Sequence, residues 1–518
     1  MTAGLPEESF LLVESVSGED MGSHRVGNRD PGPIVIAGAS GFVGTWLLQE
    51  LGSHYRWIGL SRFDRPSSDD RLEWRTVDLF SLPTLETALQ GAKTAVYLVH
   101  SMLPSARLVQ GDFVDMDLLL ADNFARAAEK AGIEHIVYLG GLLPRKEREL
   151  SQHLASRQEV ERTLRSRGAT VTVLRAGLIY GRGGSSMRML LQLVRRLPVM
   201  ILPGWTRQLT QSIDVRDVVR AFDRTLSDSR FQGGTWDIAG HEPMTYREMI
   251  LRAAHLIGRK PLTVNFPANF IGLSKLWVAL ISQSSPQLVN PLLASLRHSL
   301  VARENDLGKE LQEKATPFEQ SVRDSVDEQG RLVGCPEPTH LRKRRRTVRE
   351  ARKVRSVQRM PCPAGWTAPD VAAAYGQWLT RSSGALVRVE EQADDGTLIF
   401  RWRWTGWSLL ELQPSIHTRE QDFRRVYYIR GGLLTRMKVD PPGRFEFRLA
   451  EEGQAVLAAI HEYAPRLPWR LYQATQANIH LLVMRAFGAY LHRLQKSDAS
   501  PPGERDEGGT APTPQPFC

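Results

Sequence analysis

The chain has 518 residues, more than one ordinary hydrophobic core can organise, so its length predicts two or three domains. Hydrophobic residues make up 42% and charged residues 24%, as in a globular protein, and the longest apolar runs are too short to predict a membrane-spanning helix. The formal net charge is +10, but residues 342–359 hold ten basic residues against the single acid Glu350. The charge therefore belongs to one stretch and does not indicate a basic nucleotide-binding domain.

The three cysteines lie far apart in the sequence, at Cys335, Cys362 and Cys518. They include no close pair that would predict a zinc site or a disulfide framework, so we expect no metal and a reducing, cytoplasmic compartment. Residues 1–32 carry acids before any basic residue and lack a sustained apolar run, unlike a secretory signal or a transit peptide. We expect this segment and residues 497–518, which are rich in Pro, Gly and charge, to be disordered.

The first element in chain order is an apolar run over residues 34–37 that leads into three glycines spaced three apart. A continuous apolar run is typical of a parallel strand buried on both faces, and an amphipathic helix is predicted after it. In a dinucleotide-binding turn the first glycine permits the tight bend, the second admits the pyrophosphate and the third lets the helix pack closely on the strand. The residues that we assign to the cofactor here are Gly38, Ser40, Gly41, Phe42, Val43 and Gly44.

A second strand is predicted over residues 56–62, and it ends in Arg62. An NAD-specific site usually places an acid at this position for the ribose hydroxyl, whereas an arginine accommodates the 2′-phosphate of NADP. We therefore expect NADP as the cofactor rather than NAD. The alternative interpretation of Arg62 is a solvated loop arginine.

Further strands are predicted near residues 74, 95, 135 and 171, in alternation with helices, which predicts an α/β fold with a doubly wound parallel sheet. The Gly-x-x-Gly-x-x-Gly loop and the later segments 94–102, 136–142 and 173–181 resemble the short-chain dehydrogenase/reductase superfamily. The resemblance covers residues 33–330 and implies an NAD(P)-binding Rossmann domain.

The same resemblance implies further contacts with the dinucleotide. Asp78 and Leu79 follow the third predicted strand and correspond to the pair that contacts the adenine in the family. Val99 and His100 follow the fourth strand, at the turn on the nicotinamide side. His100 narrows that pocket or offers it a polar contact, and a structural capping role is the alternative.

The chain departs from the family at the active site, where the resemblance implies a Ser, a Tyr and a Lys. The tyrosine position holds His153, the lysine position holds Arg157, and the serine position falls on the glycines at 140–141. The absence of all three groups is similar to an atypical, NmrA-like subgroup. Histidine can transfer a proton near neutral pH, and arginine can hold a ribose or phosphate without acting as a base. The alternative for His153 is a solvated position on a charged helix over residues 148–167.

Residues 182–302 are expected to form the substrate side of this domain. Arg188 and Trp205 are candidate substrate contacts, with a surface arginine and a packed tryptophan as the alternatives. We expect Asp214 to cap the helix that follows it. The stretch from 262 to 302 predicts further helices.

Residues 331–362 are predicted to be a basic linker. Its charge cluster at 342–359 could bind an anionic partner such as nucleic acid or anionic lipid. The cluster has no interleaved aromatic residues for base stacking, which weakens the nucleic-acid hypothesis, and a solvated linker is the alternative.

Residues 363–496 are predicted to form a separate, smaller α+β domain. Hairpin strands are predicted over residues 387–390, 398–404, 426–429 and 445–447. Helices are expected over residues 454–463 and 469–494. A curved antiparallel sheet closed by the long second helix would be similar to helix-grip folds that hold apolar ligands, with a simple aromatic core as the alternative.

Three hypotheses about function remain open from the sequence. The first is an NADPH-dependent oxidoreductase for an apolar carbonyl or quinone, in which His153 and Arg157 are catalytic. The second is a non-catalytic NADP(H) sensor that changes its partners with the state of the nucleotide. The third is a lipid or isoprenoid carrier with a structural dinucleotide.

Overall fold

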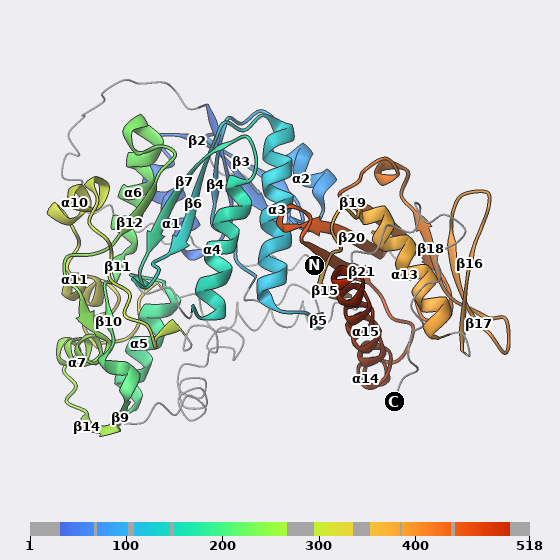
Figure 1. Ribbon diagram of the computed structural model, residues 1–518. Coiled ribbons are helices and arrows are strands. Elements are labelled where there is room, and N and C mark those ends of the chain that lie inside the picture. Colours follow the sequence, from blue (N-terminus) through green and yellow to red (C-terminus); the bar gives the residue numbers. More distant parts are fainter. Residues whose placement is uncertain are drawn as a thin grey trace, which may run out of the picture.

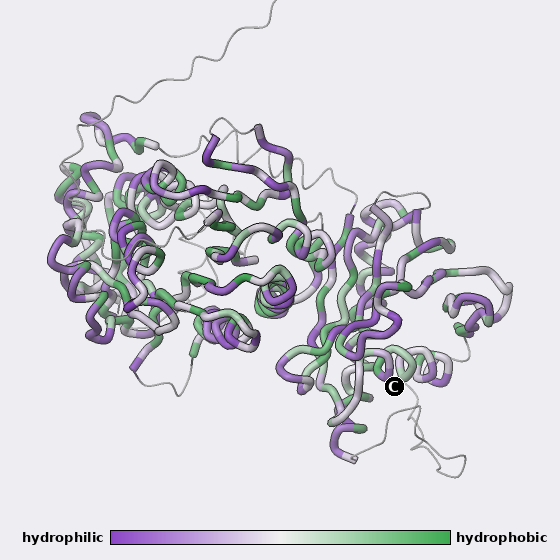
Figure 2. Tube along the Cα trace, turned by 90° about the horizontal axis from the view of Figure 1, so that it is seen from above, coloured by the Kyte–Doolittle hydropathy of each residue, from purple (hydrophilic) through white to green (hydrophobic). Residues whose placement is uncertain are grey.

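The computed structural model describes residues 32–66, 70–101, 108–145, 150–266, 295–334, 353–383, 386–436 and 441–497. Disorder was expected for residues 1–32 and 497–518. Apart from residues 32 and 497, both segments lie outside the described residues. Figure 1 shows an N-terminal part, coloured blue to yellow, beside a C-terminal part, coloured orange to red. Seen from above in Figure 2, hydrophobic segments run through the interior of both parts. No helix within the described ranges combines the length and the apolar character needed to cross a membrane.

The N-terminal part is built on a seven-stranded sheet in which every neighbouring pair is parallel. The order is β12-β7-β6-β4-β1-β2-β3, so the chain fills one side of β1 and then crosses to the other side at β4. The strands are β1 (Pro33–Ala37), β2 (Arg56–Ser61), β3 (Leu72–Thr76), β4 (Thr94–Tyr97), β6 (His135–Gly141), β7 (Thr170–Ala176) and β12 (Thr235–Ile238). The predicted doubly wound sheet is confirmed, and its switch point lies between β1 and β4.

Helices cover both faces of this sheet. Ile34 and Ile36 point into a core shared with α1 and α6, whereas Val35 and Ala37 point into a core shared with α2, α3 and α4. Because side chains alternate along a strand, one continuous apolar run supplies both cores. The helices are α1 (Phe42–Leu51), α2 (Leu82–Ala88), α3 (Phe113–Ala131), α4 (Gln152–Arg165) and α6 (Val215–Ser227).

A smaller group of elements follows the carboxyl end of β7. It comprises β8 (Ile179–Tyr180), α5 (Ser185–Arg196), β9 (Val199–Pro203), β10 (Leu209–Thr210), β11 (Ile213–Asp214), β13 (Met244–Thr245), α7 (Tyr246–Leu256), β14 (Leu262–Phe266), α10 (Asp306–Glu313) and α11 (Phe318–Arg323). The cap predicted at Asp214 is confirmed, because its Oδ1 accepts from the N–H of Arg216 at 2.8 Å.

The prediction of helices from residue 262 onward is wrong at its start, because residues 262–266 form the strand β14. This strand pairs in parallel with β9. Its apolar residues alternate with Thr263 and Asn265, and a period of two favours a strand over a helix. The remainder of that expectation, residues 267–294, lies outside the described residues.

The C-terminal part is an eight-stranded sheet in the order β16-β17-β18-β19-β20-β21-β15-β5, antiparallel except for the last pair. Its own elements are β15 (Val354–Pro361), α13 (Ala368–Ser382), β16 (Val387–Glu391), β17 (Leu398–Trp402), β18 (Ser408–Pro414), β19 (Arg424–Gly431), β20 (Arg444–Ala450), β21 (Ala455–Tyr463), α14 (Trp469–Ala474) and α15 (Gln476–Lys496). Both predicted hairpins are confirmed, as β16–β17 and β19–β20. Aromatic side chains of α13 and α15, such as Tyr375 and Phe487, fill the core on one face.

The helix expected over residues 454–463 is wrong, because residues 455–463 form strand β21. The strand lies between β20 and β15, and both of its faces are covered. Val456 faces the core under α13 and α15, whereas Leu457 faces a core shared with α3. An apolar run buried on both faces lacks a period of two, so its sequence resembles that of a buried helix. The helix expected over 469–494 is present but divided at Thr475.

The eighth strand of this sheet comes from the N-terminal part. Strand β5 (Leu108–Gln110) pairs in parallel with β15, which joins the two parts of the molecule along one sheet. Residues 354–361, assigned to a linker from their charge, are therefore a strand at the join. The linker expectation is wrong for these residues, because their cations pair with carboxylates that lie far away in the sequence.

The cations of β15 form ion pairs within the molecule. Arg355 Nη2 lies 2.8 Å from Asp78 Oδ2, and Arg359 Nη1 lies 2.6 Å from Glu159 Oε1. Each of these pairs joins β15 to the N-terminal part. At Arg355 and Arg359, carboxylates of this chain thus take the place of the anionic partner expected for the basic cluster. Residues 342–352 of the cluster lie outside the described residues.

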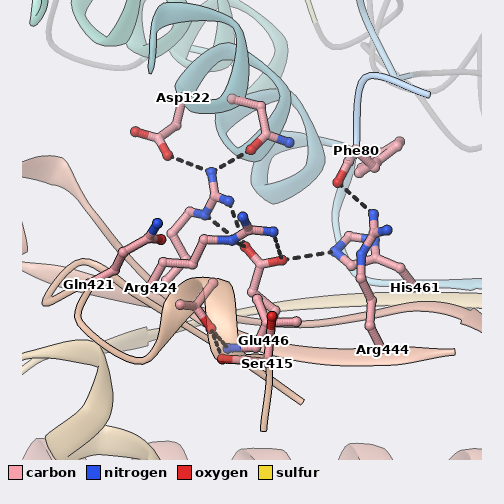
Figure 3. A network of polar contacts seen from close by, with 12 residues as sticks. Phe80, Asp122, Ser415, Gln421, Arg424, Arg444, Glu446 and His461 are labelled. Carbon is pink, nitrogen blue, oxygen red and sulfur yellow. Dashed lines mark hydrogen bonds and ion pairs between the residues drawn. The ribbon is translucent and has the colours of Figure 1, made fainter. Parts of the chain in front are cut away.

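A buried polar network joins α3 to the C-terminal sheet, as Figure 3 shows. Arg448 on β20 is fully buried, with Nη1 2.9 Å from Asp122 Oδ2 and Nε donating to Glu446 Oε1 at 2.8 Å. Glu446 also accepts from Arg424 Nε at 3.1 Å. Burial holds the pKa of the adjacent His461 well below its usual value, so its imidazole is neutral. The two parts therefore share an interface that contains charge as well as apolar surface.

Candidate functional site

The glycine loop connects the carboxyl end of β1 to the first turn of α1. Gly38 has a φ of 95°, a left-handed conformation that favours glycine, and its carbonyl oxygen accepts from the N–H of Gly41 at 2.9 Å. A Cβ on Gly44 would collide with that carbonyl and lie 2.8 Å from Ala39 Cα. The helix can therefore approach the turn this closely only because residue 44 is glycine.

The first turn of α1 is open to an anion. Its N-cap residue is Gly41, which offers no side chain to the first-turn N–H groups. Ser40 and Gly41 are exposed, and Phe42 and Val43 supply the first two amides of the helix. Uncapped amides and the positive end of the helix dipole bind phosphate groups. The residues of the loop thus fit the pyrophosphate of a dinucleotide.

Arg62 is the first residue after β2 and is exposed. Because β2 pairs with β1, its carboxyl end is adjacent to the glycine loop. In doubly wound folds the ribose of the adenosine lies here, and a guanidinium suits its 2′-phosphate. Arg65, three residues later, instead lies over the ring of Trp74, 5.0 Å from its centroid.

The turn after β4 carries Val99 and His100 and lies directly against the glycine loop. The N–H of Leu98 donates to the carbonyl of Ala37 at 2.9 Å, and a Cβ on Gly38 would lie 3.0 Å from Leu98 Cβ. Val99 is half-buried, whereas His100 keeps contact with solvent. The two strands that flank the switch point therefore bring the loop and His100 to the same crevice.

Asp78 and Leu79 follow the edge strand β3, whose carboxyl end lies beside that of β2. The carboxylate of Asp78 accepts from the N–H of Phe80 at 3.2 Å and pairs with Arg355 of β15. Although desolvation opposes it, the charge of Arg355 lowers the pKa of Asp78. Leu79 offers its carbonyl oxygen to Asn123 at 2.8 Å. The structure therefore shows both residues in contacts within the protein, and the adenine contact stays a prediction.

His153 and Arg157 lie on the first turns of α4, near His100. His153 is half-buried rather than solvated, and its Nδ1 is buried without a hydrogen-bond partner among the described residues. Burial, then the charges of Arg157 and His100, lowers the pKa of His153 to about 3, so the imidazole is neutral at pH 7. Strand β6 ends beside them in Gly140 and Gly141.

Asp117 is a site residue that the sequence reasoning missed. It lies on α3 and is buried, and its Oδ1 accepts from the N–H of Ser101 at 2.6 Å and from the Ser101 hydroxyl at 2.8 Å. Its Oδ2 lies 3.4 Å from Arg157 Nη2. Asp117 therefore ties the turn after β4 to α4 and fixes Arg157. The available signal was a carboxylate inside an otherwise apolar helical stretch.

These residues lie at the carboxyl ends of β1, β2, β4 and β6, which is where a doubly wound sheet has its ligand-binding crevice. It offers an uncapped helix start for phosphate, an exposed arginine at the end of β2 and a neutral histidine whose Nδ1 has no hydrogen-bond partner within the described ranges. In the described part of the chain, no group of three or more His, Cys, Asp or Glu side chains is placed to hold a metal ion. The crevice is suited to a dinucleotide.

The chain is similar to several known proteins. Residues 34–239 match the NAD dependent epimerase/dehydratase family. A ceramide reductase of Caulobacter vibrioides is 31% identical over 250 residues, which is 46% of this chain and 74% of the relative. A Citrobacter triphenylmethane reductase complexed with NADP(H) aligns at 18% identity with a TM-score of 0.46, over 57% of this chain and 100% of its own.

An NADPH-dependent quinone oxidoreductase of Escherichia coli, complexed with NADPH, aligns at 19% identity with a TM-score of 0.45, over 56% of this chain and 98% of its own. The family match spans the strands of the N-terminal sheet. The ceramide reductase is matched over 74% of its length. The chain belongs to the NAD-dependent epimerase/dehydratase family.

Proposed function

We propose that the protein is an NADPH-dependent reductase that acts on a carbonyl group carried by an apolar, long-chain molecule. The observation that carries the proposal is the uncapped start of α1 beside the exposed Arg62. The first feature binds a pyrophosphate, and the second favours NADPH over NADH because it can neutralise the 2′-phosphate.

The cofactor would be held by the glycine loop, with Gly38, Gly41 and Gly44 shaping the turn and Arg62 holding the 2′-phosphate. A nicotinamide cofactor held there would supply the hydride for the substrate carbonyl carbon, and the carbonyl oxygen would take up a proton from solvent to give the alcohol. His100, which is exposed at the turn after β4, would narrow the end of the site where the carbonyl lies or offer it a polar contact.

His153 would act as a hydrogen-bond donor to the substrate oxygen. Because its pKa is about 3, it carries a single ring proton at neutral pH and cannot serve as an imidazolium acid. A neutral imidazole can still polarise a carbonyl through its N–H group. Arg157 is a positioning residue in this proposal, because its charge, fixed by Asp117, adds to burial in lowering the pKa of His153.

The substrate class is suggested by the relative named a ceramide reductase, which is 31% identical to this chain. Ceramides are long-chain lipids, and on this ground we infer an apolar, long-chain carbonyl compound as the substrate. The direct test is loss of NADPH absorbance with ketone analogues of ceramide and with quinones, presented in detergent micelles. Turnover of neither class, together with tight and different binding of NADP⁺ and NADPH, would favour a nucleotide sensor instead.

Replacing Arg62 with alanine is expected to weaken NADPH binding by about tenfold to a hundredfold, because one or two charge-assisted hydrogen bonds to the phosphate are lost. NADH binding should be unchanged, since NADH lacks the 2′-phosphate. Calorimetric titration of both nucleotides measures this. Arg65→Ala is the matched control, because Arg65 lies on the same segment but over Trp74. An equal loss for NADH and NADPH in the Arg62 variant would exclude the phosphate role.

Replacing His153 with alanine is expected to lower kcat by about a hundredfold while the affinity for NADPH stays the same. In the unsubstituted protein, kcat/KM should show no inflection near pH 6.5, because the pKa of His153 lies at about 3 and the group does not titrate there. Stopped-flow reduction between about pH 5 and 8 measures both. His255→Ala, an exposed histidine on α7, is the control. Unchanged turnover in the His153 variant would remove it from the mechanism.

A further inference from the structure

An exposed apolar surface lies on the small sheet formed by β9 and β14. Val199 and Ile201 of β9 stand opposite Leu262 and Val264 of β14, and these four side chains are 46%, 45%, 66% and 46% exposed. We name them the apolar strand face. Met200, on the other side of β9, is fully buried in the core under α5 and α7. The sheet is therefore apolar on both sides, although solvent normally faces polar residues on one of them.

Basic residues gather at one end of this face. Arg195 and Arg196 precede β9, and Arg259 and Lys260 precede β14. Because the two strands are parallel, all four cations lie at the same end of the sheet, and the three arginines line one surface cavity. Residues 186–213 and 249–266 contain no Asp or Glu. The apolar strand face thus adjoins a positive surface with no carboxylate from its own segments.

Apolar side chains beside clustered cations match the surface of an anionic phospholipid bilayer. The apolar residues enter the boundary between headgroups and acyl chains, while Arg and Lys remain at the level of the anionic headgroups. A second copy of this chain is a poorer match, because the same segments would offer its cations no acid. We propose that the apolar strand face, with Arg195, Arg196, Arg259 and Lys260, docks the protein on an anionic membrane.

The position of this surface relative to the cofactor crevice supports the assignment. Helix α5 begins next to the glycine loop, since a Cβ on Gly184 would lie 2.9 Å from the ring of Phe42. The twelve residues of α5 then span about 18 Å to the start of β9. Figure 1 shows β9 and β14 at the end of the N-terminal part that points away from the C-terminal part. Docking there would hold the crevice near the bilayer. If the proposed function is correct and the substrate is a membrane lipid, docking would bring the enzyme to its substrate.

Co-sedimentation of the full chain with vesicles tests the proposal without any substrate. The vesicles are phosphatidylcholine alone or with about one third phosphatidylglycerol. We expect binding to the anionic vesicles, a loss of about tenfold in Arg259→Glu/Lys260→Glu, and a loss of severalfold in Ile201→Ser/Val264→Ser. Raised salt should weaken binding of the unsubstituted protein.

Two control pairs match these variants on the C-terminal part. Ile479→Ser/Leu482→Ser removes apolar residues that are 59% and 60% exposed, and Arg466→Glu/Arg470→Glu reverses exposed charges. Both should bind anionic vesicles like the unsubstituted protein.

Three outcomes would overturn the proposal. The first is no binding to anionic vesicles, and the second is equal loss in the control pairs. The third is unchanged vesicle binding in Ile201→Ser/Val264→Ser. If this variant also had a lower Tm, the apolar strand face would pack against another part of the chain. If it instead had a lower mass by light scattering, the face would bind a second copy of the chain. Because the reductase assay uses micelles, a protein that binds vesicles but reduces nothing would contradict only the proposed function.

Discussion

Replacing Gly44 with alanine is expected to raise the Kd for NADPH by about a hundredfold or more. A methyl group there would collide with the carbonyl of Gly38 and lie 2.8 Å from Ala39 Cα, and both contacts are with backbone that cannot rotate away. Either the turn or the helix must move, and at least two amide hydrogen bonds to phosphate would be lost, each worth about 1.5 kcal/mol or more. Calorimetric titration with NADPH measures the change.

A matched glycine lies in another helix. Gly376, in α13, has open space where a Cβ would be placed. Gly376→Ala should therefore leave NADPH binding unchanged and stabilise the protein by about 0.5–1 kcal/mol, because alanine is the better helix former. The same chemical change thus has opposite consequences in the two helices.

Gly41→Asp separates a lost site from a lost fold. Aspartate is a favourable N-cap, so circular dichroism and Tm should be nearly unchanged, but its carboxylate would occupy the anion position and abolish NADPH binding. If Gly44→Ala and Gly41→Asp both bound NADPH like the unsubstituted protein, the glycine loop would not be the cofactor site.

The N-terminal fold was predictable because its signals are local. Each central strand is a continuous apolar run, and the turn at Gly38 requires a residue that accepts a positive φ. These properties depend on neighbours within a few positions in the chain. The helix that carries His153 was equally predictable, whereas the assignment of His153 to the family's tyrosine position stays a prediction.

Long-range pairing was not predictable from the same sequence. The basic residues of β15 indicate a solvated linker until Asp78 and Glu159, about 280 and 200 positions away, are placed beside them. Asp117 was missed for the same reason, because its partners Ser101 and Arg157 lie on other elements. Whether a charged residue can be buried depends on its ion-pair partner, and the partner is not known from the sequence.

Replacing Arg448 with alanine is expected to lower the free energy of unfolding by about 3–5 kcal/mol. Arg448 is fully buried between Asp122 of α3 and Glu446 of β20, so its removal leaves two carboxylates with less compensation. Arg424 remains beside Glu446, at 3.1 Å, but within the described part of the chain Asp122 then keeps a single cation, Arg126. Guanidinium chloride unfolding, followed by fluorescence and by circular dichroism, measures the loss.

Because the network spans the two parts of the molecule, the pair should also be coupled. In a double-mutant cycle, Arg448→Ala and Asp122→Ala are expected to interact by about 1–3 kcal/mol, since each removes the partner of the other. Arg388→Ala is the control, because its pair with Glu390 lies on the surface at 3.4 Å and should contribute less than about 1 kcal/mol. If Arg448→Ala unfolded at the same denaturant concentration as Arg388→Ala, the buried network would not hold the C-terminal sheet against α3.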